Sequence, residues 1–213
     1  MARDDWFRRT AWSDLDAQDF SSRLSRSRSN FHKAQYLRIQ AHTLASTGKV
    51  NLARAALELL ERLFLEFPEP SELALAHLQS AKCYESLGNW AKALEHLELS
   101  LDAQTKYPNS DSGVFLEYPW FVARHNLSDC YARALESLQK AHLAFPVTAF
   151  KAAATRAFIA KAQRDSAAAQ YAIEALRAAA LKQSQFQSHR DLGLVGKEFA
   201  PFVKRLNEIA AAR

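Results

Sequence analysis

The sequence predicts an all-α fold, and composition and spacing both support this prediction. The chain of 213 residues contains 39 alanines and 28 leucines, which favour helices, but only six valines and four isoleucines. Its five glycines form neither of the phosphate-binding patterns GxGxxG and GxxxxGK[ST]. Apolar residues recur every three or four positions between short turns, as expected for paired amphipathic helices.

Residues 1–33 are expected to form an aromatic segment followed by a capping helix. Ser13 and Asp16 have the spacing of a helix N-cap and its reciprocal partner, and Phe20 and Leu24 follow at helical spacing. We expect the aromatic side chains that precede this helix to cover the first repeat, with binding of a partner as the alternative. These aromatic residues are Trp6, Phe7 and Trp12.

Residues 34–184 are expected to contain four repeats. Aligning the chain with itself at an offset of 40 residues places Gly48 on Gly88 and Pro68 on Pro108, and an offset of 38 continues the pattern to Pro146. A glycine and a proline that keep the same separation in two segments are a specific sign of internal repetition. The predicted repeats are 34–73, 74–111, 112–149 and 150–184.

Each repeat has the pattern of a helix pair with a turn at its glycine. Alanines at equivalent positions of the two helices, such as Ala41 and Ala53, predict a close helix contact. The third repeat has Pro119 instead of a small residue, which predicts a kink or a shorter helix beginning at Trp120. The fourth has Arg164 in place of the turn glycine. Since one pair cannot bury its apolar face alone, we expect the pairs to stack as a solenoid.

The pattern resembles the tetratricopeptide repeat, most closely at Tyr84, Gly88, Trp90 and Ala93. The repeats of this chain, at 38–40 residues, are longer than the roughly 34 residues of that family. Residues 5–8, 35–41 and 193–196 look like those of a group of uncharacterised bacterial tetratricopeptide proteins. This resemblance implies a bacterial, cytoplasmic protein and supplies no activity.

Residues 185–213 are expected to form a loop and a C-terminal capping helix from about Lys197 to Ala212. Solenoids need such a polar-faced cap at their ends. The apolar stripe of this helix consists of Phe199, Phe202, Val203, Leu206 and Ile209.

No motif in the sequence supports catalysis or metal binding. The seven histidines show no HxH, HxxxH or HExxH spacing, and Cys83 and Cys130 lie outside any CxxC motif. No segment has the roughly 18 apolar residues of a membrane span. We therefore expect a cytoplasmic, non-enzymatic protein with no cofactor, no bound metal and no membrane contact.

The resemblance also implies a binding surface, because the first helix of each tetratricopeptide pair lines the concave face of the array. The corresponding side chains are basic, with two aromatic rings, and suit a partner protein or an acidic peptide. The predicted partner-binding residues are Arg38, His42, Lys82, Trp120, Arg124, Lys151, Phe158 and Lys161.

Binding of another protein through this groove is therefore the first functional hypothesis. An inhibitor or immunity-type partner of a bacterial toxin is an alternative. A second alternative is association with nucleic acid through residues 151–213, where 11 basic and 5 acidic side chains leave an excess of positive charge. We consider nucleic acid the less favoured partner, because most aromatic residues of this region have the helical spacing of core positions and are not expected to stack on bases. The sequence does not indicate an oligomeric state.

Overall fold

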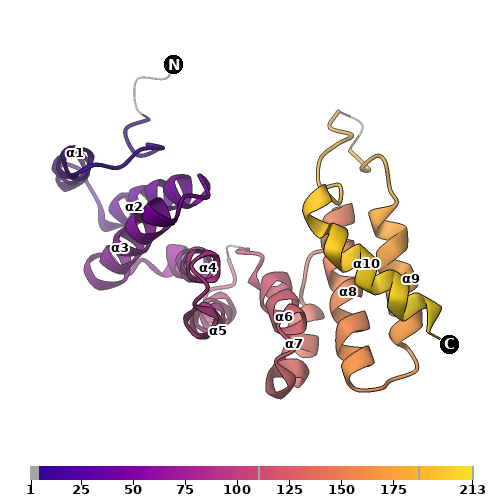
Figure 1. Ribbon diagram of the computed structural model, residues 1–213. Coiled ribbons are helices and arrows are strands. Elements are labelled where there is room, and N and C mark those ends of the chain that lie inside the picture. Colours follow the sequence, from indigo (N-terminus) through magenta and orange to yellow (C-terminus); the bar gives the residue numbers. More distant parts are fainter. Residues whose placement is uncertain (1–4, 110, 187, 213) are drawn as a thin grey trace. The chain divides into compact units, whose positions relative to one another are not determined.

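The computed structural model describes residues 5–109, 111–186 and 188–212, and over these residues the chain is all-α without a β-strand (Figure 1). The predicted fold class is confirmed at this level. Most of the helices form adjacent pairs joined by short turns. The described α-helices are α1 (Asp14–Ser25), α2 (Asn30–Ala45), α3 (Val50–Glu66), α4 (Pro70–Ser86), α5 (Trp90–Lys106), α6 (Val114–Arg124), α7 (Tyr131–Leu138), α8 (Pro146–Ala162), α9 (Ala168–Ala179) and α10 (Ala200–Ala211).

The chain divides into two compact units. Unit 1 extends to Val114 and contains α1 to α5, and unit 2 begins at Phe115 and contains nearly all of α6 and the remaining helices. The boundary lies two residues after the start of the third predicted repeat, at Ser112. Each unit has its own buried core and is described by itself.

Unit 1 contains two helix pairs with the same length and spacing. The pair α2–α3 begins at Asn30 and Val50, and the pair α4–α5 begins 40 residues later, at Pro70 and Trp90. The helices of each pair contact each other, and α4 also contacts both helices of the first pair. The four equivalent alanines at which the sequence predicts close helix contacts are buried. They are Ala41, Ala53, Ala81 and Ala93.

A residue with left-handed backbone conformation follows the first helix of every pair. The φ angles are 72° at Gly48, 73° at Gly88, 56° at Asn126 and 58° at Arg164. These positions are 40, 38 and 38 residues apart, the offsets that the sequence alignment uses. Glycine adopts this conformation freely and asparagine tolerates it, whereas arginine is strained there. The fourth pair therefore keeps the left-handed turn, although Arg164 stands there in place of glycine.

Within unit 1, the N-terminal segment packs on the first helix pair, as the sequence predicts. Ser13 and Asp16 form the reciprocal N-cap of α1. The buried side chain of Gln40 accepts a hydrogen bond from the backbone N–H of Arg9 (2.9 Å) and donates one to the carbonyl of the same residue (2.8 Å). The Trp6 ring lies 5.1 Å from Phe20 and 5.0 Å from Tyr36 between centroids. The aromatic segment thus covers the first helix pair.

Helix α6 continues through Pro119, so the predicted shorter helix beginning at Trp120 is wrong. Proline cannot donate to the carbonyl four residues earlier, which is that of Phe115. The hydroxyl of Ser137 in α7 donates to this carbonyl instead, at 3.3 Å. A hydrogen bond between helices therefore replaces the one that proline removes.

The predicted C-terminal helix is present as α10 and contacts α8 and α9, as Figure 1 shows. Leu206 and Ile209 of its apolar stripe are buried. The preceding irregular segment returns to the start of α8, where the backbone N–H of Val147 donates to the carbonyl of Gly193 at 2.8 Å. Helix α10 thus covers the core of unit 2.

Candidate functional site

Three of the predicted partner-binding residues gather in unit 1. Arg38 and His42 are one helical turn apart on α2, and Lys82 lies on the neighbouring α4. Arg8 of the N-terminal segment is also near, because its charge acts on His42 together with those of Lys82 and Arg38. We call Arg8, Arg38, His42 and Lys82 the basic face of unit 1.

The surroundings of His42 lower the pKa of its imidazole. Partial burial of the ring lowers this pKa below its ordinary value of 6.5, and the positive charges of Lys82, Arg38 and Arg8 lower it further. Neighbouring cations disfavour a second positive charge, so this imidazole is largely neutral at pH 7. Burial is thus the main cause of the lowered pKa, and the positive charges of Lys82, Arg38 and Arg8 add to it.

Arg38 differs from the other members of the basic face because it forms an ion pair with a buried carboxylate. Its guanidinium donates to Glu72 of α4, and the side chains are only 16% and 8% exposed. Removing one partner of a buried pair leaves the other uncompensated. The first role of Arg38 is thus to hold α2 against α4, while His42 and Lys82 are exposed to solvent.

The other five predicted residues lie in unit 2, and the two aromatic ones are buried. Trp120 is 3% exposed and Phe158 is 1% exposed. The Trp120 ring lies 4.9 Å from Phe202 of α10, and the guanidinium of Arg205 covers the Phe158 ring at 4.3 Å. The expectation that these two rings line an open groove is therefore wrong. Helix α10 covers both of them, and they belong to the core of unit 2.

The three remaining cations differ in their surroundings. Lys151 forms an ion pair with Glu117 at 2.8 Å, and Arg124 lies over the Trp120 ring at 5.3 Å. Lys161 is exposed near the α8–α9 turn, beside a hollow of about 580 Å³ that has charges of both signs in its lining. Packing within unit 2 accounts for Lys151 and Arg124, and only Lys161 is freely exposed.

Unit 1 also contains a histidine pair that no motif in the sequence indicates. His77 of α4 and His96 of α5 place their Nδ1 atoms 3.1 Å apart, and the His77 ring stacks on Phe64 at 4.2 Å. Burial lowers the pKa of His77 to about 4, and His96 contributes to the shift. The two residues are 19 positions apart on different helices, so no spacing motif could reveal them.

The described residues contain no group of three or more His, Cys, Asp or Glu side chains that could hold a metal ion. Burial raises the pKa of the Cys83 thiol to about 11, which leaves it a poor nucleophile. None of the described helices is both long enough and apolar enough to cross a membrane.

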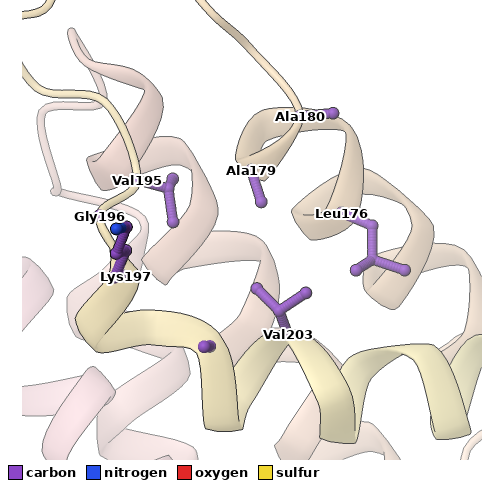
Figure 2. Close-up of a pocket in the computed structure, with 8 residues that line it drawn as sticks. Leu176, Ala179, Ala180, Val195, Gly196, Lys197 and Val203 are labelled. Atoms are coloured by element: carbon purple, nitrogen blue, oxygen red, sulfur yellow. The ribbon is translucent and has the colours of Figure 1, made fainter.

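Unit 2 has a shallow apolar hollow of about 390 Å³ between the end of α9 and the start of α10. Figure 2 shows Ala179, Val195 and Val203 around this space. Lys197 is the one charged residue in its lining. Because no polar group converges on the hollow, nothing in it selects or orients a ligand.

The described fold and surfaces define the class of protein as an all-α protein built of helix pairs, with a basic face on the first two pairs. The chain matches no known family, and neither a curated protein nor a solved structure shows significant similarity to it.

Proposed function

We propose that this protein is a non-enzymatic, tetratricopeptide-like binding protein whose basic face recognises an acidic segment of a partner protein. The observation that carries the proposal is the placement of Arg38 and His42 on α2 beside Lys82 on the contacting helix α4, with Arg8 near enough for its charge to act on His42. Carboxylates are the groups that such a set of donors binds best. The cytoplasmic location, the bacterial source and the solenoid arrangement of all four repeats remain predictions.

The arrangement of donors supports a peptide more than a compact anion. Lys82 and the His42 ring come from two adjacent helices, so they offer donors along a surface. Neither forms an ion pair within the described part of the chain, whereas Arg38 is engaged by Glu72. An acidic segment can therefore approach His42 and Lys82 without breaking a structural contact.

Fluorescence anisotropy of a labelled peptide of about 12 residues, rich in Glu and Asp and ending in a free carboxylate, tests the proposal. The variant His42→Glu/Lys82→Glu should bind about tenfold more weakly than wild type, since each reversed charge now repels the peptide. Arg54→Glu is the matched control, because this exposed arginine lies on α3, outside the basic face. Added salt should weaken wild-type binding by screening.

Equal affinities of wild type and the double variant would overturn the assignment of the site. An RNA or DNA of the same length in the same assay tests the nucleic-acid alternative. Tighter binding of the nucleic acid than of the acidic peptide, with a steep dependence on salt, would favour that alternative over the proposal.

A further inference from the structure

A pocket in unit 1 has a chemistry opposite to that of the basic face. It has a volume of about 320 Å³ and lies where α3, α4 and α5 meet. The helices contribute one face each, at positions one or two turns apart. Its lining consists of Leu57, Glu58, Glu61, Phe64, Ser80, Tyr84, Lys92 and His96.

Three of the lining side chains are rings, and they form a continuous aromatic wall. His96 lies 6.0 Å from Phe64 and 5.3 Å from Tyr84 between ring centroids. His77 supports this wall from behind, through its stacking on Phe64 and its Nδ1 contact with His96. Because the two Nδ1 atoms share a hydrogen bond, at least one imidazole must be neutral to accept it.

The charges at this pocket are predominantly negative. Glu58 and Glu61 lie one turn apart on α3, are exposed, and form no ion pair within the described part of the chain. The single lysine of the lining, Lys92, is neutralised by Glu95 at 3.0 Å. Two uncompensated carboxylates therefore stand beside a wall of uncharged aromatic rings.

We infer that this pocket binds an organic cation, namely an alkylammonium or guanidinium group carried by a small molecule or by a lysine or arginine side chain. Aromatic faces attract such cations, and carboxylates supply the charge-assisted hydrogen bonds. The apolar side chain of Leu57 and the Phe64 ring suit the methylene stem of the ligand. A metal ion fits this pocket less well, because among the described residues no third His, Cys, Asp or Glu side chain is placed with the histidine pair to bind one. The inference is independent of the acidic partner proposed above.

NMR titration of the full chain tests this inference through the ring resonances of His96 and Tyr84. The probes are n-butylammonium chloride and n-butylguanidinium chloride, with sodium chloride at equal concentrations as the ionic control. A short peptide with one central lysine forms a further arm that distinguishes a side chain from a free ligand. We expect saturable shifts with dissociation constants of about 1 to 10 mM, as for one small group at an open site.

Three variants test whether the organic cation binds in this pocket. Glu61→Gln removes one carboxylate at an exposed position and should weaken binding about fivefold, and Phe64→Leu removes one ring and should weaken it similarly. Glu208→Gln changes an exposed glutamate of unit 2 and should leave the affinity unchanged. Circular dichroism shows whether each variant remains folded, and the exposed Glu61 keeps the test valid if Phe64→Leu does not fold.

The inference is overturned by any of three results. The first is the absence of saturable shifts up to about 50 mM of either organic cation, far above the expected dissociation constant. The second is an equal response to sodium chloride. The third is an unchanged affinity of the folded Glu61→Gln variant. Saturation by zinc chloride but by neither organic cation would assign the histidine pair to a metal instead.

Discussion

Four residues set the direction of the chain after the first helix of each pair, and only two of them are glycine. Gly48 and Gly88 have open space where a Cβ would lie, so the backbone conformation is what favours glycine there. Arg164 adopts the same conformation with a side chain. The sequence allowed the substitution at this turn to be recognised from spacing, but the retained left-handed geometry could only be seen in the structure.

Replacing Arg164 with glycine should therefore stabilise the protein. The gain should be about 0.5 to 1 kcal/mol, because relief of the left-handed strain exceeds the entropy that glycine adds to the unfolded chain. The midpoint of urea unfolding measures this change. The control is Gln163→Gly at the preceding position, where φ is −84°. This control should destabilise, and a destabilising Arg164→Gly would contradict the account of the turn.

The histidine pair should make stability depend on pH. The folded pKa of His77, about 4, lies below its ordinary value of 6.5. Between these values the unfolded chain binds a proton that the folded chain does not, so stability falls as pH decreases from about 6.5 to 4. His96 acts in the same direction, because burial also lowers its pKa. The charges of Glu95 and Lys92 also act on His96, with opposite signs.

Urea midpoints between pH 4 and 8 for wild type and His77→Phe isolate this contribution. The phenylalanine keeps a ring against Phe64 but cannot be protonated. As pH decreases, the free energy of unfolding of wild type should fall relative to that of His77→Phe. A difference that is constant over this range would show that His77 does not titrate with folding.

Among the helices, α6 shows how a local conflict in the sequence is resolved by a neighbouring element. Pro119 alone predicts an interrupted helix, whereas the structure satisfies the Phe115 carbonyl through Ser137 of α7. Ser137→Ala should cost about 1 kcal/mol, the typical value of one hydrogen bond, and it leaves a partly buried acceptor without this partner. The hydrogen bond from Ser137 to the Phe115 carbonyl could not be predicted from the sequence, because it depends on how α6 and α7 pack.

A double-mutant cycle checks whether Ser137 compensates for the proline. In a Pro119→Ala background the N–H of residue 119 can donate to Phe115, so Ser137→Ala should then cost much less. Chemical unfolding of the four proteins supplies the coupling energy. Equal costs in both backgrounds would mean that Ser137 and Pro119 act independently.

Comparing the buried Trp120 with the exposed Trp90 tests whether α10 covers the core of unit 2. Trp120→Ala should destabilise by about 3 to 5 kcal/mol, as expected for a large ring removed from a core. Trp90 lies at the start of α5 and is 58% exposed. Trp90→Ala should cost less than about 1 kcal/mol. Thermal unfolding of both variants compares them, and similar losses would contradict the burial of Trp120 under α10.

At the scale of the whole molecule, the helices and their pairing could be predicted from the spacing of residues in the sequence. The helix pairs, the reciprocal N-cap of α1 and the C-terminal helix follow from residues within one or two turns of each other, and the offsets follow from glycines and prolines that recur at a fixed separation. The candidate site was harder to predict. Trp120 and Phe158 have the spacing of groove residues, but a helix distant in sequence covers them. The pocket with His96 combines three helices, which no local pattern encodes.

Recognition of an acidic partner by the basic face is the central claim, and the pKa of His42 measured by NMR tests it most directly. In the free protein this pKa should lie below 6.5, because the ring is partly buried and surrounded by Lys82, Arg38 and Arg8. Saturation with the acidic peptide should raise it, since a carboxylate beside the ring favours its protonated form. A free pKa at or above 6.5, or one that bound peptide leaves unchanged, would contradict the claim.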